Sequence, residues 1–98
     1  MTNIDYSGLP DYMRDGIRNY LEHGLRPGDF LLAVLSNDLM EAFVQVDDVN
    51  RAAMHDWVRF LYNHAPRNSW GSPDLVDDWV RLGGIKGAHK QAASATVQ

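Results

Sequence analysis

Four histidines are the side chains most able to bind a metal ion in this chain of 98 residues, which contains no cysteine. They are His23, His55, His64 and His89, and no two of them have the spacing of ligands on a shared helix. A structural zinc site requires four converging ligands. We therefore expect no metal site, and we expect the histidines to cap helices or to face solvent.

Carboxylates and hydroxyls offer the other routes to catalysis. Asp74 and Asp78 are four residues apart, so both can lie on one side of a helix and shift each other's pKa. An aspartate in a first helical turn also stabilises the helix dipole without any catalytic role. Ser36, Ser69 and Ser72 lack the nucleophile-elbow pattern. The sequence predicts a protein that is not an enzyme and uses no cofactor.

The segment 63–72 combines basic, aromatic and polar residues. Arg67 could pair with an anion, and Trp70 could stack on a base or anchor a protein partner. Alternatively, Trp70 folds back over the junction between two helices. An anion site at a lone helix end is disfavoured because every expected helix start carries aspartate: Asp11, Asp29, Asp47 with Asp48, and Asp74.

Several polar residues on the expected helices have no local backbone role, namely Asn37, Asp38, Tyr62 and Asn63. They either form a buried hydrogen-bond network that fixes the helix register or line a binding site. The candidate residues for binding a partner or ligand are Asn37, Asp38, Asn63, Arg67, Trp70, Gly71 and Ser72.

The charge is negative and uneven along the chain. The formal net charge is -4, with 9 acidic and 3 basic residues in positions 1–50 and 4 acidic and 6 basic residues afterwards. An acidic surface disfavours nucleic acids and membranes and permits a basic protein partner. The first 20 residues are not typical of a signal peptide, and the apolar run from Phe30 to Leu35 is too short to span a membrane. We expect a cytoplasmic protein.

Hydrophobic periodicity predicts an all-α fold, a compact bundle of about four helices after a short irregular N-terminus. The expected helices cover residues 9–23, 29–45, 49–64 and 73–82. Gly24 and Gly83 are expected to end the first and the last, Ser72 to cap the last, and Gly16 to let another helix approach closely. Residues 1–84 are expected to form a single helical domain, and residues 85–98 a flexible polar tail.

The expected domain is small for the apolar residues that it must bury. A domain of about 75 ordered residues hides only about 60% of its unfolded surface. The domain would have to bury three tryptophans, three phenylalanines and an apolar central helix, which is a large apolar surface for its size. We therefore expect a homo-oligomer or a tightly bound partner.

The pattern of motifs resembles a family of small phage and prophage accessory proteins. The resemblance covers about residues 9–84 and rests on Pro27-Gly28-Asp29-Phe30-Leu31, Asn37-Asp38-Leu39, Tyr62-Asn63 with Ala65-Pro66, and Gly71-Ser72. It implies a compact phage protein made in the bacterial cytoplasm. Such accessory proteins often inhibit host defence, as anti-CRISPR proteins do.

Three functional hypotheses follow. The first is a phage-encoded accessory protein that binds and inhibits a host protein, such as a component of a defence system, without catalysis. The second is an oligomeric sponge that sequesters a signalling nucleotide in pockets between subunits, with Arg67, Trp70 and Ser72 as the first residues to test. The third is a phage adaptor that works through self-assembly.

Overall fold

The computed structural model describes residues 4–97, and for residues 91–97 it describes the backbone alone. Within this range the chain is helical and has no strand, which confirms the all-α class. The expected count of four helices is wrong, because the described chain contains seven α-helices and two short 3-10 helices. They are η1 Asp11–Met13, α1 Arg14–His23, α2 Asp29–Leu35, α3 Leu39–Gln45, α4 Asp48–Ala52, α5 Met54–His64, η2 Arg67–Ser69, α6 Pro73–Leu82 and α7 Gly84–Val97.

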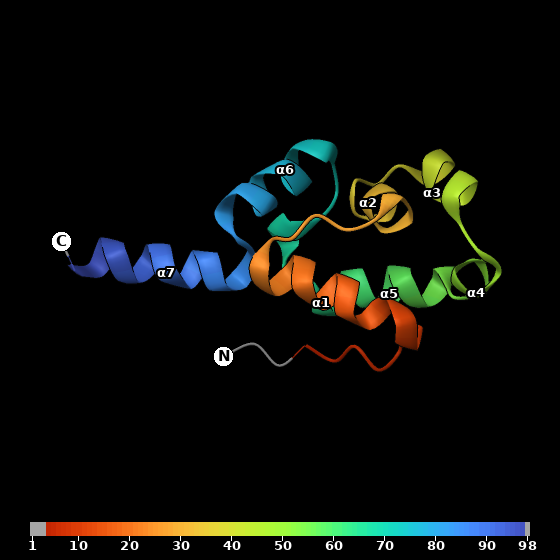
Figure 1. The fold of residues 1–98 in the computed structure, drawn as a ribbon, viewed down its shortest axis with the longest axis horizontal. Helices are drawn as coiled ribbons and strands as arrows, with labels where there is room; N and C mark the ends of the chain where they lie inside the picture. The colour runs from red at the N-terminus through yellow and green to blue at the C-terminus, as the bar shows by residue number, and fades with distance from the viewer. Residues whose placement is uncertain (1–3, 98) are drawn as a thin grey trace.

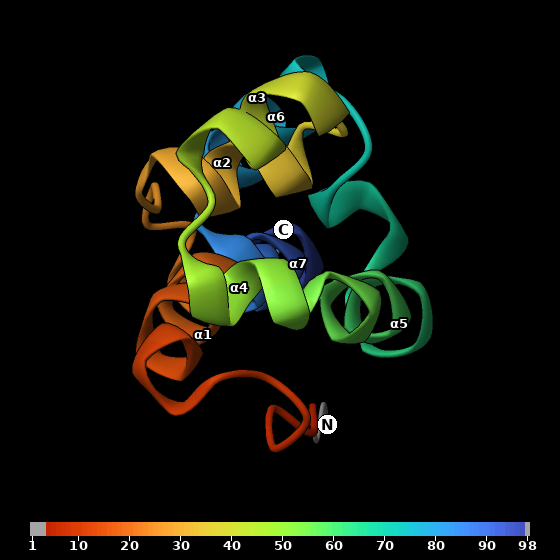
Figure 2. The ribbon, with the colours of Figure 1, turned by 90° about the vertical axis from the view of Figure 1, so that its right-hand side faces the viewer.

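The helices form two layers with the core between them. Helices α2, α3 and α6 lie in one layer, and α1, α4 and α5 lie in the other (Figures 1 and 2). Each layer contributes fully buried side chains, among them Leu35 from α2 and Tyr20 and Trp57 from α1 and α5. None of the helices in the described chain is long and apolar enough to cross a membrane.

Local signals set the ends of α1 and α6. Gly24 ends α1 in the left-handed conformation, with φ 71°, and its N–H donates to the Tyr20 carbonyl at 2.9 Å. The Ser72 hydroxyl accepts the Leu75 N–H at 3.2 Å, and Pro73 occupies the first position of α6. Gly83 ends that helix with φ 88°. These caps confirm the expected helix ends at Gly24 and Gly83 and the expected cap at Ser72, because each depends only on residues within one turn. The expected start of the first helix at residue 9 is wrong, because residues 11–13 form η1 and α1 begins at Arg14.

The expected helix over residues 29–45 is instead two helices, α2 and α3. The break falls at Ser36–Asp38, where Asn37 adopts φ 62° and the Asp38 N–H donates back to the Ala33 carbonyl at 2.9 Å. The Asp38 carboxylate then caps α3 by accepting the Glu41 N–H at 3.1 Å. Asparagine and aspartate favour such caps over helix interiors, so the polar residues end one helix and begin the next.

The expected helix over residues 49–64 is also divided, into α4 and α5. The interruption is at Ala53, with φ −96° and ψ 9°. The expected cap at Asp47 is present, since its carboxylate accepts the Asn50 N–H at 2.7 Å. The loop that follows α5 contains the single turn η2, in which Ser69 is fully buried.

Residues 85–98 are expected to form a flexible polar tail, and the structure places residues 85–97 in helix α7, which leads away from the two layers (Figure 1). The part of that expectation that concerns Gln98 and the side chains of residues 91–97 lies outside the described residues. Alanine, lysine and glutamine are good helix formers, which is consistent with a helix here.

The start of α7 touches the end of α1 backbone to backbone. A Cβ added at Gly84 would lie 2.6 Å from the Gly24 nitrogen and 2.7 Å from the His23 nitrogen. A Cβ added at Gly24 would lie 2.8 Å from the Gly84 nitrogen. Only glycine permits this approach, so the Gly24–Gly84 contact fixes where the C-terminal helices meet α1.

Two buried hydrogen bonds connect the layers. The Tyr20 hydroxyl donates to the Ser69 carbonyl at 2.6 Å, and the Trp79 indole N–H donates to the Tyr20 carbonyl at 3.0 Å. Burial raises the pKa of Tyr20 above its ordinary value, and burial raises the pKa of Tyr6 from 10.0 to about 12. Both tyrosines are therefore neutral in the folded state at pH values where they begin to ionise in the unfolded chain.

We expect the free energy of unfolding to fall as the pH rises from 10 to 12. In this range the unfolded chain loses the Tyr6 and Tyr20 protons first, so ionisation favours unfolding. Urea unfolding at a series of pH values measures the effect. The Tyr6 hydroxyl has no hydrogen-bond partner in the described chain, so Tyr6→Phe should flatten the slope with little change at pH 8. An unchanged slope would contradict the burial of Tyr6.

Candidate functional site

Helix α3 buries only Ala42 and leaves its large apolar side chains exposed. Two further apolar side chains are exposed on α5, and they line a common pocket with residues of α3. The exposed fractions range from 46% for Phe43 to 78% for Met40 and Tyr62. Clustered exposure of this kind marks interaction surfaces. We call these six residues the α3–α5 apolar surface: Leu39, Met40, Phe43, Val44, Val58 and Tyr62.

A pocket of about 180 Å³ opens within this surface between α2, α3 and α5. Figure 2 shows α3 in the upper layer and α5 in the lower layer, with the segment that carries η2 connecting the layers on the same side. Apolar groups provide most of the pocket wall, and Asn37 and Asp38 are among the residues that line it. The lining residues are Val34, Asn37, Asp38, Leu39, Ala42, Met54, Val58, Leu61, Tyr62 and Trp70.

Three of the seven candidate residues meet at this pocket: Asn37, Asp38 and Trp70. Asn37 and Asp38 are exposed and form the α2–α3 break, so the interpretation of a buried network is wrong for them. Trp70 is half-buried, and its indole N–H has no hydrogen-bond partner in the described chain. Trp70 is therefore neither fully exposed, as an anchor for a partner would be, nor fully buried, as a core residue would be.

The other candidates lie apart from this pocket. The Gly71 N–H donates to the Leu35 carbonyl at 2.7 Å, and the Ser72 hydroxyl caps α6, so both have structural roles. Arg67 is exposed on η2, and Asn63 lines a different pocket. Arg67, Trp70 and Ser72 therefore form no common site within one chain. The hypothesis of a nucleotide pocket between subunits stays a prediction.

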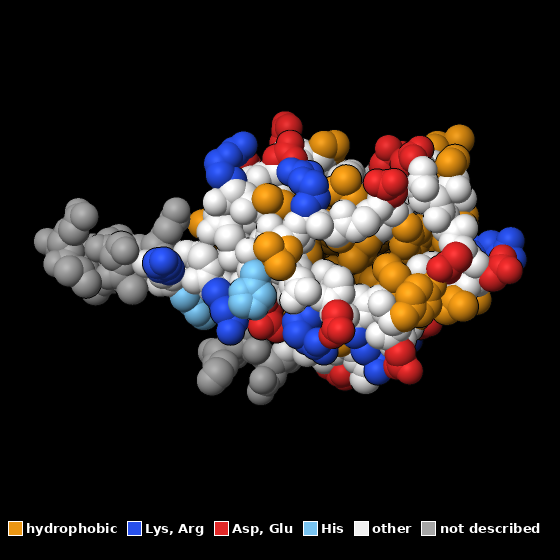
Figure 3. All heavy atoms as spheres, viewed as in Figure 1, with side chains coloured by type: hydrophobic (Ala, Val, Ile, Leu, Met, Phe, Trp, Pro, Cys, Tyr) orange, Lys and Arg blue, Asp and Glu red, His pale blue; other side chains and the backbone are white. Residues whose placement is uncertain are grey.

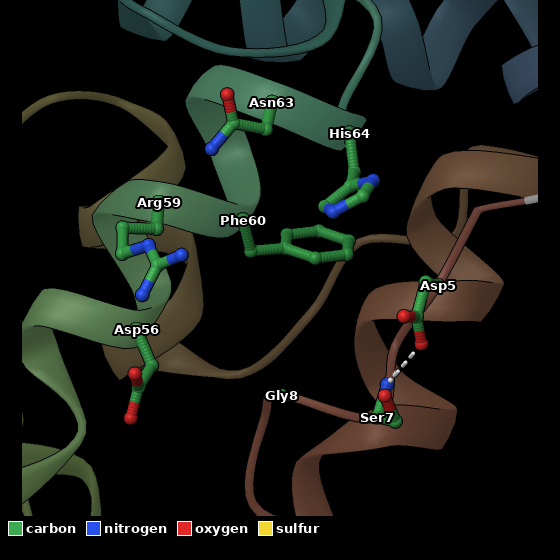
Figure 4. A pocket seen from close by; sticks show the side chains of 8 residues that line it. All are labelled: Asp5, Ser7, Gly8, Asp56, Arg59, Phe60, Asn63 and His64. Carbon is green, nitrogen blue, oxygen red and sulfur yellow. Dashed lines mark hydrogen bonds between the residues drawn. The ribbon is translucent and has the colours of Figure 1, made fainter.

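The pocket that contains Asn63 is polar and measures about 210 Å³ (Figure 4). Asp56, Arg59 and Asn63 line it from α5, and the N-terminal segment with Asp5 and Ser7 faces them. The Ser7 N–H donates to the Asp5 carboxylate at 2.9 Å, and hydrogen bonding by Ser7 lowers the pKa of Asp5. Charges of both signs line this open pocket, so it does not favour an anion or a cation.

The floor of the polar pocket is aromatic. The His64 ring packs on Phe60, with ring centroids 5.8 Å apart and planes tilted by 36°. No hydrogen bond joins His64 to Asp5 or Ser7 in the described chain, so these three side chains do not form a nucleophile–base–acid relay.

The other side chains that could bind a metal or act as catalytic acids lie apart in the described chain. Among residues 4–90 no group of three or more histidine, aspartate or glutamate side chains converges as metal ligands do. Asp74 is exposed in the first turn of α6, and Asp78 pairs with Arg81 at 2.8 Å. The pKa shifts found among carboxylates in the described chain are downward, at Asp5 and Asp47. Lowered carboxylate pKa values are those of ion-pairing or capping groups and not of general acids.

The sequence analysis missed the four exposed apolar residues of α3. If residues 29–45 formed one helix, Leu39, Ala42 and Phe43 would continue the inner face of its first half. The left-handed residue Asn37 changes the helix direction, so Ala42 alone is buried. The consecutive cap formers Ser36, Asn37 and Asp38 are the sequence signal that could have revealed the break.

Comparison with known proteins gives no further identification. No protein-family model, no curated protein and no solved structure matches the chain.

Proposed function

We propose that this protein is a non-catalytic binding module that holds a partner protein against the α3–α5 apolar surface. The observation that carries the proposal is the exposure of six large apolar side chains on two neighbouring helices. Scattered exposed apolar residues are ordinary, but here three of the six, Leu39, Val58 and Tyr62, line one preformed pocket, as is typical of a protein interface. The pocket of about 180 Å³ would receive one apolar anchor side chain of the partner.

The charges beside this surface favour a partner with basic residues next to its apolar anchor. Asp38 lines the pocket, Glu41 is exposed on α3, and neither α3 nor the pocket lining carries a basic residue. Gln45 donates to the Glu41 carboxylate at 2.8 Å, so Glu41 is held in place along the helix. An amphipathic helix with apolar residues on one face and lysine or arginine beside them would complement both features.

The resemblance to phage accessory proteins supports a specific class of partner. In this proposal the partner is a bacterial host protein, and the chain inhibits it by occupying its surface. A component of a host defence system is the partner that the resemblance favours.

Replacing Leu39 by aspartate should abolish partner binding without unfolding the protein. Leu39 is 63% exposed and lines the pocket, and it occupies the first position of α3, where a carboxylate stabilises the helix dipole. We expect the affinity for the partner to fall at least about a hundredfold. Leu25→Asp is the matched control, because Leu25 is 56% exposed and lies between α1 and α2, outside the surface.

The measurement is affinity capture from bacterial lysate on the wild-type chain and both variants, followed by calorimetry with the purified captured protein. The proposal expects one protein that wild type and Leu25→Asp retain and Leu39→Asp loses. Capture of no specific protein, or equal capture by all three chains, would overturn the proposal.

A further inference from the structure

A second hollow, separate from the α3–α5 apolar surface, lies between α1, α2 and the start of α4. Its volume is about 320 Å³, and it shares no lining residue with the pocket described above. Met13, Phe30 and Leu31 give it an apolar floor. Figure 3 shows hydrophobic side chains gathered in the right-hand half of that face, where these elements meet.

The charged groups that line this hollow are all acidic. They are the carboxylates of Asp29 and Asp47, and no lysine, arginine or histidine lines the hollow. Asp29 is exposed and forms no hydrogen bond or ion pair through its side chain with any other described residue. Asp47 is held by the Tyr12 hydroxyl, which donates to it, and by the Asn50 N–H. The Asp47 carboxylate is therefore held in place, and the Asp29 carboxylate is free to pair with a cation.

No close packing within the chain requires glycine at two positions that line the hollow. A Cβ added at Gly16 or at Gly28 would meet nothing within 4 Å, and both residues line the hollow. The expectation that Gly16 admits a neighbouring helix is wrong for this chain alone. Glycine inside α1 is unfavourable for the helix. The missing side chain keeps the hollow open instead, which is what close approach by a ligand requires.

We propose that this hollow binds a basic side chain, arginine foremost, presented by a partner protein. An arginine has an apolar stem that fits the floor of Met13 and Phe30, and its guanidinium can meet the two carboxylates and stack on the Tyr12 ring. Lysine supplies the charge without the planar group and binds less tightly. The excess of acidic residues in positions 1–50 attracts such a partner from a distance. This inference does not rest on the proposed function, because it concerns different residues.

Nuclear magnetic resonance provides a direct test with a defined probe. The probe is a capped peptide with one arginine between two pairs of alanines, and the controls replace that arginine by lysine or by uncharged citrulline. The Trp57 indole N–H donates to Asn50, which in turn donates to Tyr12 at the hollow, so the indole signal reports occupancy. We expect saturable shifts of this signal and of the Gly16 and Gly28 amides at millimolar peptide, weaker shifts with lysine, and none with citrulline.

Three variants separate a specific site from general attraction to an acidic protein. Asp29→Asn should weaken arginine-peptide binding about tenfold, whereas Asp74→Asn, an equal charge change in the first turn of α6, should leave it unchanged. Gly16→Leu should block binding without lowering the melting temperature, because space surrounds that position. Equal binding of the citrulline peptide, equal effects of the two asparagine variants, or undiminished binding by Gly16→Leu would each overturn the proposal.

Discussion

Replacing Gly84 by alanine is expected to destabilise the fold by about 2–5 kcal/mol, from the sum of backbone strain and overpacking. Gly84 adopts φ 70°, a conformation that disfavours any Cβ. That Cβ would also lie 2.6 Å from backbone atoms of Glu22 and Gly24, which have no flexible end that could move aside. Since small domains are stable by about 5–15 kcal/mol, a large part of the folded stability would be lost.

Urea unfolding followed by circular dichroism measures this loss as a lower midpoint concentration. Gly24→Ala should show a comparable loss, because Gly24 forms the other half of the contact with φ 71°. Gly8→Ala is the control, since a Cβ at that position meets nothing within 4 Å. If Gly84→Ala unfolded at the wild-type midpoint, α1 and α7 would not meet in solution as the structure describes.

Trp57→Ala is expected to destabilise the protein by about 3–5 kcal/mol, as deletion of a buried aromatic side chain does. Trp57 is completely buried and packs edge-on against Phe30, with ring centroids 6.1 Å apart. Its indole N–H donates to the Asn50 side chain at 3.0 Å. The substitution therefore removes both apolar contacts and the donor for a buried oxygen.

Asn50→Leu separates the polar part of that effect from the packing part. It leaves the Trp57 N–H buried without an acceptor, for which we expect a loss of about 1–3 kcal/mol. Tyr62→Ala is the control for removing an aromatic ring, because Tyr62 is 78% exposed, and it should leave the unfolding midpoint nearly unchanged. Equal midpoints for Trp57→Ala and Tyr62→Ala would contradict the position of Trp57 in the core.

The features that could be predicted from the sequence depend on neighbours within a few residues. The caps at Gly24, Asp47, Ser72 and Gly83 follow from the chemistry of single turns, and they are where the sequence analysis placed them. The break at Asn37 is also local, but the apolar periodicity on both sides of it favoured a continuous helix. Periodicity indicates helical structure well and helix continuity poorly.

The features that could not be predicted join residues distant in the sequence. The Tyr12 hydroxyl donates to Asp47, and the Asn50 amide donates to Tyr12, although η1 and α4 are separated by three helices. Nothing in the residues around Tyr12 predicts either hydrogen bond. The same holds for the candidate pocket, where α3, α5 and Trp70 meet only because the layers pack as they do. Such pairings depend on tertiary packing, which the pattern of one sequence does not contain.

The Gly24–Gly84 contact also has a consequence for biosynthesis. Translation proceeds from the N-terminus, so α1 leaves the ribosome well before the glycine against which its end rests. Until residue 84 emerges, α1 lacks the contacts that it makes with α7 in the folded chain. The nascent chain should therefore expose the apolar face of α1 for most of its elongation. Chaperones that recognise apolar segments would bind α1 at this stage.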